Sequence, residues 1–339
     1  MNESEQIIVA VIGLAHGHIY QMCRGLIAAG AQLKYVYDED LSAVQSFTRV
    51  FPQVIPVQSE EDVFSDREVK LVASADIPSK RAALGIRAMK AGKDFFCAKA
   101  PAITQRQIRG IKKTMRKTGN KFFVFYSEFF ESEAAVYADK LIKEGTIGKV
   151  LNVTILAPHR LGESRPKWFY EREKSGGILI DIGSHQFDQF LTFTGNNRAK
   201  ILSSGIGNFA HRDFEGFDDF GDVHLVGENG ATGYIRVDWF TPEALPVFGD
   251  GKVVILGETG YIELRKYIDV GCGDSCENVI LVTKDKISKE SVKDKTEKPF
   301  FSNLIYDCLH RTETAMSFKQ TFHAMELAVK SQKKAKRLI

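Results

Sequence analysis

The sequence predicts an α/β protein of two domains, the first built on a doubly wound parallel sheet and the second on an open, mainly antiparallel sheet. The 339 residues exceed what a single hydrophobic core usually organises. Short apolar strands alternate with helical patterns in the N-terminal part of the chain, which is typical of a parallel sheet. Beyond about residue 127, hairpin signals replace this alternation, and hairpins join antiparallel strands.

The N-terminal alternation begins with a β-branched run, Ile7–Ile12, which ends in a glycine-containing turn and leads into a helical pattern, Ile19–Ala29. Further strands are predicted at Leu33–Tyr37, Val69–Ser74, Asp94–Ala98 and Lys121–Tyr126, with helices at Leu41–Val50, Lys80–Ala91 and Ile103–Thr118. Right-handed crossovers between such strands give a parallel sheet. We therefore expect residues 1–126 to form the first domain.

The second part of the chain, residues 127–339, is predicted to form a domain of different architecture. Two hairpins are predicted, His224–Val226 with Tyr234–Trp239 across Asn229-Gly230, and Val253–Leu256 with Tyr261–Leu264 across Glu258-Thr259-Gly260. The charged run Lys284–Lys298 has no apolar period and is interpreted as a solvated loop. A helix is expected over residues 312–335, because apolar residues recur there at helical spacing.

The composition favours a small, weakly charged partner. The 46 basic and 43 acidic residues leave a formal net charge of +3, far from the excess that marks a nucleic-acid-binding protein. No apolar run reaches the roughly 18 to 20 residues that span a bilayer, and Met1–Gln6 is polar where a signal peptide would be hydrophobic. Five cysteines spread over a long chain argue against a disulfide framework. We therefore expect a cytoplasmic protein with no nucleic-acid or membrane partner.

A candidate dinucleotide site follows the first predicted strand. The turn reads Gly13-Leu14-Ala15-His16-Gly17-His18, and it lies between a strand and a helix, where the dinucleotide-binding fingerprint belongs. Gly13 permits a tight turn, and the small Ala15 lets the backbone approach a pyrophosphate at the helix N-terminus. Strict spacing would place glycine at positions 15 and 18, so the pattern is imperfect. His16 and His18 could suggest a metal site, but two ligands without a third nearby make a weak one. We therefore expect both histidines to line the phosphate-binding turn.

Carboxylates follow two of the predicted strands. Asp38 ends the second strand, where it could accept hydrogen bonds from an adenosine ribose, although it could instead be an acid at a helix N-terminus. A carboxylate there would repel the 2′-phosphate of NADP, so we expect NAD to be preferred. Asp76 follows the strand Val69–Ser74 and is also expected to contact the cofactor.

Two further stretches carry candidate catalytic groups. Lys99 follows the strand Asp94–Ala98 directly, which favours a position in the cofactor crevice, although an exposed loop lysine is the alternative. Asp181 and His185 stand four residues apart after the glycine-rich entry Gly176-Gly177, and that spacing places both side chains on one face of a helix. A histidine satisfied in the core is the alternative interpretation of His185.

The chain resembles the Gfo/Idh/MocA oxidoreductase family over essentially all of its length. The resemblance rests on the glycine turn, on Asp38, on Gly92-Lys93 leading to Lys99, and on Gly176-Gly177 with Asp181 and His185. It implies a Rossmann domain that holds NAD(P), and a second domain whose open sheet lines the substrate pocket and commonly forms the oligomer interface. It also implies that Lys99, Asp181 and His185 are the catalytic trio. A homodimer or homotetramer is therefore expected.

Four positions, Ala98, Ala100, Arg81 and Glu128, depart from the family pattern. The usual Glu-Lys-Pro is Ala98-Lys99-Ala100-Pro101, so the proline comes one place late and no cis Lys-Pro bond can form. Arg81 corresponds to the family's histidine at the start of the helix, and Glu128 to a usual arginine. These departures leave the orientation of Lys99 and the contacts to substrate open.

A second group of residues, in the second domain, is expected to bind substrate. His159, Arg160, Lys167 and Trp168 precede the glycine pair, and a tryptophan beside cationic groups suits a sugar, although an ordinary polar loop is equally compatible. Cys272 and Cys276 lack further ligands nearby, so no metal site is predicted.

These observations predict reversible hydride transfer between NAD and a secondary alcohol of a sugar or cyclic polyol. His185 would exchange the hydroxyl proton, Asp181 would orient it, and Lys99 would stabilise the developing alkoxide. The sequence leaves open whether Lys99 or His185 is the base. The alternative is a non-catalytic regulatory protein of the same fold that binds a dinucleotide or a sugar.

Overall fold

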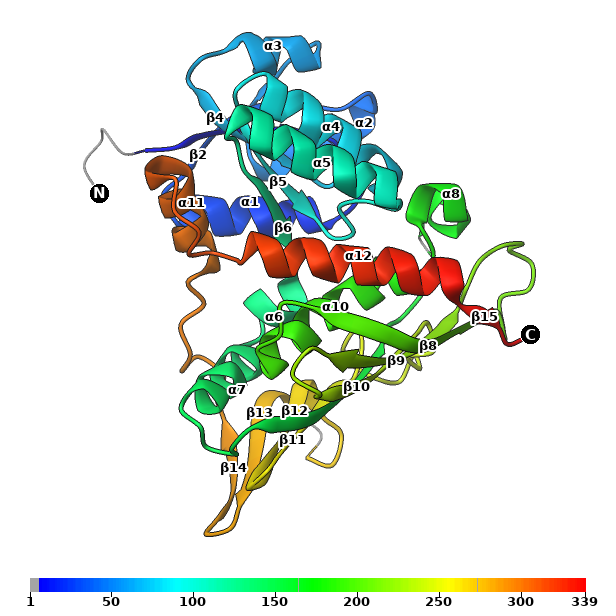
Figure 1. Cartoon of the computed structure of the whole chain (residues 1–339). Helices are drawn as coiled ribbons and strands as arrows, with labels where there is room; N and C mark the ends of the chain where they lie inside the picture. The colour runs from blue at the N-terminus through cyan, green and yellow to red at the C-terminus, as the bar shows by residue number, and fades with distance from the viewer. Residues whose placement is uncertain (1–5, 164, 273) are drawn as a thin grey trace. The chain divides into compact units, whose positions relative to one another are not determined.

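The computed structural model describes residues 6–163, 165–272 and 274–339, and the chain divides into two compact units. Unit 1 comprises Met1–Phe125 and Pro299–Phe318, and unit 2 comprises Tyr126–Lys298 and Lys319–Ile339. Figure 1 traces the chain through both units. Among the described residues, no helix is long and apolar enough to cross a membrane.

Unit 1 contains a six-stranded parallel sheet. Its strands are β1 (Ile8–Ile12), β2 (Gln32–Tyr37), β3 (Ile55–Pro56), β4 (Val69–Ser74), β5 (Asp94–Ala98) and β6 (Phe122–Phe125). They are arranged in the order β3-β2-β1-β4-β5-β6, and every neighbouring pair is parallel. This is the strand order of doubly wound dinucleotide-binding sheets. From β1 the chain adds strands first towards one edge of the sheet and then, from β4 on, towards the other, so the switch point lies between β1 and β4. The predicted fold class of this part is confirmed.

Helices cover both faces of this sheet. They are α1 (His18–Ala28), α2 (Leu41–Val50), α3 (Glu60–Ser65), α4 (Pro78–Lys90), α5 (Gln105–Thr118) and α11 (Phe300–His310). Figure 1 shows α4 and α5 side by side on one face and α1 with α11 on the other. Strands buried on both faces have continuous apolar sequences, and β5 and β6 accordingly contribute fully buried Phe95, Phe96 and Phe123.

The segment Pro299–Phe318 belongs to unit 1, although the expected second domain included it. The last helix, α12, spans Phe318–Lys334 and not residues 312–335. The Asp307 carboxylate accepts the N–H groups of Thr314 and Ala315 at 2.8 to 2.9 Å, which holds the chain between α11 and α12 in a non-helical connection. The Asp307 side chain thus takes the hydrogen bonds of backbone N–H groups in a segment where the spacing of apolar residues alone indicated a helix.

Unit 2 contains a nine-stranded mixed sheet. Its strands are β7 (Val150–Pro158), β8 (Ala199–Gly207), β9 (Phe220–Gly227), β10 (Thr232–Asp238), β11 (Gly251–Gly257), β12 (Gly260–Asp269), β13 (Asp274–Thr283), β14 (Ile287–Ser291) and β15 (Lys336–Arg337). The order is β14-β13-β12-β11-β7-β10-β9-β8-β15. The β7–β10 and β8–β15 pairs are parallel, and the other pairs are antiparallel. Both predicted hairpins are confirmed, as β9–β10 and β11–β12.

The charged run Lys284–Lys298 was wrongly expected to be a loop throughout, since β14 lies within it and pairs with β13. The side chains of β14 are mostly exposed. Charged residues on an outermost strand discourage pairing with other chains, so a strand of this kind lacks an apolar period.

Unit 2 also contains the helices α6 (Ser127–Phe130), α7 (Glu133–Lys143), α8 (Arg172–Ser175), α9 (Ile178–Asp181), α10 (Gly183–Thr194) and α12, together with a 3-10 turn at Lys167–Tyr170. Of these, α7, α9 and α10 pack on one face of the unit 2 sheet. Helices α7 and α10 contact β12 and β7, whose inward residues are buried at a period of two. On the opposite face, Val254, Leu256 and Tyr261 are between 37% and 45% exposed.

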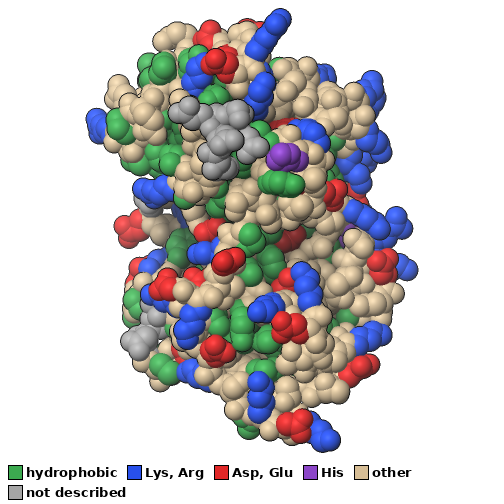
Figure 2. Space-filling view, turned by 90° about the vertical axis from the view of Figure 1, so that its left-hand side faces the viewer, with side chains coloured by type: hydrophobic (Ala, Val, Ile, Leu, Met, Phe, Trp, Pro, Cys, Tyr) green, Lys and Arg blue, Asp and Glu red, His purple; other side chains and the backbone are tan. Residues whose placement is uncertain are grey.

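The surface carries charges of both signs. On the face shown in Figure 2, basic and acidic side chains are interspersed over most of the area. Ion pairs join some of the charged residues of the chain, such as Lys34 and Asp66 at 2.6 Å. Interspersed charges of this kind produce no strong field of a single sign.

Candidate active site

The glycine turn lies between β1 and α1, at the point where the strand order of unit 1 reverses. Gly13 has a φ of 86°, and a Cβ atom there would lie 2.5 Å from the Cβ of Asp76. Its N–H donates to the Tyr37 carbonyl at 3.0 Å, and its carbonyl accepts the Ala75 N–H at 3.0 Å. Only glycine fits this backbone, and the turn is thereby held between the ends of β2 and β4.

The first helix begins directly after this turn. His18 is the first residue of α1, and its N–H donates to Nδ1 of His16 at 3.1 Å. The two imidazole rings lie 4.1 Å apart. Gly17 is the N-cap residue and has no side chain to cap the helix. A ligand can therefore come close to the N-terminus of α1. This arrangement suits a phosphate group, which helix N-termini attract.

Asp38 is fixed by the backbone around it. One carboxylate oxygen accepts the Leu14 N–H at 2.6 Å, and the other accepts the Asp40 N–H at 2.8 Å. A carboxylate has about four acceptor positions, so each oxygen retains capacity for a further donor. The geometry therefore fits a ribose diol. Asp76 packs beneath Gly13, and burial raises the pKa of its carboxyl group.

Lys99 is buried at the end of β5, in a segment organised by a buried arginine. Arg81, on α4, has no exposed surface. Its Nε donates to the Asp76 carbonyl at 2.6 Å, and its Nη1 donates to the carbonyls of Ala98 and Ala100 at 3.1 and 3.2 Å and to that of Lys99. The peptide bond between Lys99 and Ala100 is cis. Arg81, noted in the sequence only as a departure from the family pattern, thus holds the backbone on both sides of Lys99.

Asp181 and His185 lie in unit 2 on successive helices, α9 and α10, whose junction at Ile182 keeps right-handed helical angles. The chain enters α9 through Gly176 and Gly177, with φ values of 92° and 93°. A Cβ on Gly177 would lie 2.5 Å from the Gln332 side chain, which accepts the Leu179 N–H at 2.9 Å. The glycine pair therefore lets α12 anchor the start of α9, and Asp181 and His185 are both buried.

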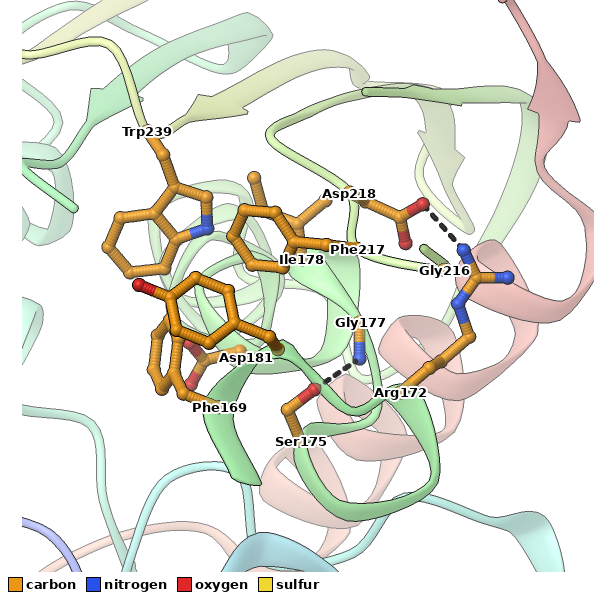
Figure 3. A pocket seen from close by; sticks show the side chains of 11 residues that line it. Phe169, Arg172, Ser175, Gly177, Ile178, Asp181, Gly216, Phe217, Asp218 and Trp239 are labelled. Atoms are coloured by element: carbon orange, nitrogen blue, oxygen red, sulfur yellow. Dashed lines mark hydrogen bonds and ion pairs between the residues drawn. The ribbon is translucent and has the colours of Figure 1, made fainter. Parts of the chain in front are cut away.

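Asp181 lines a small cavity with an aromatic wall. Its neighbours along the cavity include Phe169, Tyr170, Phe217 and Trp239. Figure 3 shows Trp239 at one end and the ion pair between Arg172 and Asp218, 2.6 Å long, at the other. The cavity measures about 10 Å³, which is room for about one water molecule, so it does not hold a sugar ring in this conformation.

Arg165 adds a cation to this wall. Its guanidinium lies 4.6 Å from the centre of the Phe169 ring and 5.2 Å from that of Trp239. Burial lowers the pKa of Arg165, and the charge of Asp181 opposes that shift. No feature of the sequence distinguished Arg165 from the other basic residues of this loop.

The other predicted substrate residues lie elsewhere in the same loop. The Arg160 guanidinium donates to the carbonyls of Pro242 and Leu245, and its Nε lies 3.5 Å from Glu243. Lys167 is exposed, and Trp168 packs edge-on against Phe169 with ring centres 5.6 Å apart. The cavity is lined instead by the next two residues, Phe169 and Tyr170, because the 3-10 turn over Lys167–Tyr170 directs them inward.

The structure brings one unpredicted carboxylate to His185. Glu128 Oε1 lies 3.9 Å from His185 Nε2 and 3.4 Å from His159 Nε2. Burial alone would raise the pKa of Glu128, but the positive charges of His185, Lys266 and His159 hold it well below its usual range. Within the described residues, no three His, Cys, Asp or Glu side chains are grouped as metal ligands.

The fold and these sites define a two-domain α/β protein with a doubly wound dinucleotide-type sheet. Residues 136–263 match the GFO/IDH/MocA C-terminal domain family. A crystal structure of a protein from Erwinia carotovora atroseptica SCRI1043, described as an oxidoreductase, is 44% identical, with a TM-score of 0.96 over 98% of this chain and 100% of that chain. The chain therefore belongs to the Gfo/Idh/MocA oxidoreductase family.

Curated relatives are more distant. The 2,7-anhydro-N-acetylneuraminate hydratase of Mediterraneibacter gnavus is 30% identical over 61% of this chain and 52% of its own length. The D-glucoside 3-dehydrogenase of Escherichia coli K12 is 31% identical over 35% of this chain and 34% of its own length. The chain thus spans about half the length, or less, of these relatives. Levoglucosan dehydrogenase, solved with NADH and levoglucosan, shares the fold at 16% identity with a TM-score of 0.79 over 97% of each chain.

We predict that Arg81 stabilises unit 1 through the Lys99 segment. Arg81→Met should lower the free energy of unfolding by about 3 kcal/mol or more, because several buried carbonyls lose their donor at about 1 to 3 kcal/mol each. Urea denaturation measures this change. Arg87→Met is the matched control on the same helix, since Arg87 pairs with Glu60 at the surface and its loss should cost under about 1 kcal/mol. Equal losses in the two variants would contradict the role given to Arg81.

Proposed function

We propose that this protein is an NAD-dependent dehydrogenase that acts on a secondary alcohol or ketone of a sugar or cyclic polyol. The observation that carries the proposal is the Asp38 carboxylate, hydrogen-bonded to the Leu14 N–H at the mouth of the Gly13 turn. A fixed carboxylate beside a helix N-terminus suits the ribose and pyrophosphate of a dinucleotide. When bound, the nicotinamide would supply the hydride acceptor or donor.

The substrate would be recognised in unit 2. Asp181 and the aromatic residues Phe169, Tyr170 and Trp239 would offer polar and apolar contacts to a sugar ring once the cavity of about 10 Å³ that they line widens to admit one. The relationship to D-glucoside 3-dehydrogenase and to D-xylose dehydrogenase of Paenarthrobacter nicotinovorans, 26% identical over 37% of this chain, supports a sugar or polyol. Arg160, Lys167 and Trp168 do not line this cavity. They would contact the substrate outside it.

Three side chains would carry the chemistry. His185 would exchange the proton of the substrate hydroxyl, because an imidazole titrates near neutral pH. Asp181 would stabilise the imidazolium from the same helical face. Lys99 would donate a hydrogen bond to the reacting oxygen, an electrostatic role that is strongest in a site without water. The buried positions of all three are compatible with these roles.

The protein would act as a homodimer or homotetramer. Val254, Leu256 and Tyr261 form an exposed apolar strip on the sheet face opposite α7 and α10, with Leu256 and Tyr261 opposite each other across β11 and β12. Neighbouring exposed apolar side chains on a sheet face favour association with another surface. A second copy of the same face would supply one.

We predict a preference for NAD over NADP. The Asp38 carboxylate would repel a 2′-phosphate by around 4 kcal/mol at 4 Å and an effective dielectric constant near 20. Salt screens part of this repulsion, and the part that remains should still favour NAD over NADP by about tenfold or more in affinity. Fluorescence titration with NADH and NADPH measures the bias without turnover. Asp38→Asn keeps an acceptor for the Leu14 N–H and removes the charge, so it should lose most of the discrimination. Equal binding of the two cofactors by the unmodified protein would overturn the assignment of Asp38.

We predict that Lys99 and His185 are needed for turnover but not for NADH binding. Lys99→Ala should reduce kcat by about two to three decades, because a charged donor to the alkoxide is lost. His185→Ala should cost about two to four decades and remove one limb of the pH profile. Asp181→Asn should cost less and should not be additive with His185→Ala.

The measurement is steady-state absorbance of reduced nicotinamide with a panel of sugars and polyols, alongside NADH binding by fluorescence. Near-normal kcat in both alanine variants would refute the catalytic assignment. A protein that binds NADH but turns over no sugar or polyol would instead favour the regulatory alternative.

We predict that substitution of the exposed strip weakens self-association. Leu256→Lys should shift the protein towards monomers in sedimentation velocity at micromolar concentration, because a buried lysine in the interface would be unpaired. Leu41→Lys, at a 73% exposed position on α2, is the control and should leave the sedimentation coefficient unchanged. A monomeric unmodified protein would contradict the proposed assembly.

A further inference from the structure

Glu128 is a buried carboxylate at the start of α6, and polar groups from three other parts of unit 2 converge on it. Its oxygen Oε2 accepts from Gln186 Nε2 at 2.7 Å and from Lys266 Nζ at 3.3 Å. Its oxygen Oε1 faces two imidazoles, those of His159 at 3.4 Å and His185 at 3.9 Å. Gln186 and Lys266 thus fix one oxygen and direct the other towards both histidine rings.

Lys266 comes from β12, and only 1% of its surface is exposed. Its ammonium group donates to the Glu128 backbone carbonyl at 3.3 Å and to Gln189 Oε1 at 3.2 Å, in addition to the Glu128 carboxylate. A buried ammonium group requires such partners, because an unpaired charge is costly away from water. Lys266 and Glu128 therefore form a nearly neutral pair beside His185.

His159 is the more exposed of the two histidines, with 18% of its side chain accessible against 3% for His185. Its Nδ1 lies 3.2 Å from the Ala157 carbonyl, and its Nε2 faces Glu128. Both ring nitrogens of His159 therefore face acceptor oxygens. A ring that carries both protons satisfies both acceptors.

We propose that Glu128 is a positioning residue for His185, whose carboxylate stabilises the imidazolium form of that ring, while Lys266 limits the stabilisation. The inference rests on the proposed function, in which His185 exchanges the substrate proton. It differs from the role given to Asp181, because Glu128 reaches His185 from another helix and is tied to a buried cation. The sequence offered Glu128 only as a departure from the family's usual arginine.

Other titratable groups surround this cluster and must be separated from it in a test. They are Tyr126 with its ring edge-on to His185 at 5.8 Å, Asp181 on α9, Asp188 on α10, Tyr267 on β12 and Glu277 on β13. Burial raises the pKa of Asp188 to about 7, so this carboxyl can titrate in the same range as an imidazole. Burial, followed by the charges of Glu128 and Glu277, raises the pKa of Tyr267 far above neutrality.

The test is a site-resolved titration of His185 in the full-length protein. Selective ¹⁵N labelling of histidine allows the ring signals to be followed by NMR from pH 5 to 9, with His185 assigned by its loss in His185→Asn. Glu128→Gln should lower the pKa of His185 by about 1 to 3 units, because an opposite charge within about 4 to 6 Å is lost. Lys266→Gln should raise it, because a like charge is removed.

The opposite signs of the two shifts distinguish this proposal from simple structural damage. Glu133→Gln is the matched control, since Glu133 is also buried in unit 2 but accepts from the N–H groups of Lys295 and Thr296. It should leave the pKa of His185 unchanged. In the double variant Glu128→Gln with Lys266→Gln, the pKa of His185 should return towards its original value.

The pH profile of kcat supplies the second readout, and its histidine limb should move with the NMR value in each variant. A shift in Glu128→Gln no larger than in Glu133→Gln, shifts of the same sign in Glu128→Gln and Lys266→Gln, or an unmoved kcat limb would each overturn the proposal. If no sugar or polyol is turned over, the proposed function and the contribution of Glu128 to turnover both fail. The NMR titration would still show whether Glu128 sets the charge of His185.

Discussion

Each unit encloses a cation that has no access to water, and the surrounding chain is arranged to satisfy it. In unit 1 the Arg81 guanidinium is surrounded by backbone carbonyls from the ends of β4 and β5. In unit 2 the Lys266 ammonium lies between Glu128 and Gln189. A buried charge without such partners would cost several kcal/mol, so these contacts restrict where neighbouring segments can lie. The segments restricted in this way are those that carry Lys99 and His185.

The strands and hairpins could be predicted from the sequence because the relevant signals are local. The apolar runs at Ile8–Ile12 and Val69–Ser74, and the Asn229-Gly230 turn, report burial and chain reversal within a few residues. The parallel pairing of β7 with β10 could not be predicted, because nothing in either strand identifies the partner. The start of α12 was misplaced for a related reason. Asp307 satisfies backbone groups up to eight residues ahead, and an apolar period does not report that contact.

The candidate site follows the same division. Gly13 and the glycine pair before α9 could be singled out from the sequence because glycine favours the positive φ values found there. Asp38 could be singled out because it directly follows its strand. The partners of Lys99 and His185 could not, since the contacts of Arg81 with Ala98 and of Glu128 with Lys266 join residues far apart in the chain. Trp168 was expected to contact substrate, and this stays a prediction. The cavity beside Asp181 is lined by Phe169 and Tyr170, the two residues that follow Trp168 in the 3-10 turn.

The two charged departures from the family pattern, Arg81 and Glu128, have a common physical consequence. Each places a charge where it is buried, and each charge is matched by groups that do not take part in the proposed chemistry, namely backbone carbonyls for Arg81 and Lys266 for Glu128. Neither position can therefore be exchanged singly for the usual family residue without leaving buried groups unsatisfied or bringing two buried cations together. An arginine at position 128 would face the Lys266 ammonium, and like charges at such distances repel strongly in a low dielectric. The residues at 128 and 266 thus act as one electrostatic unit, and the charge beside His185 is a property of that pair.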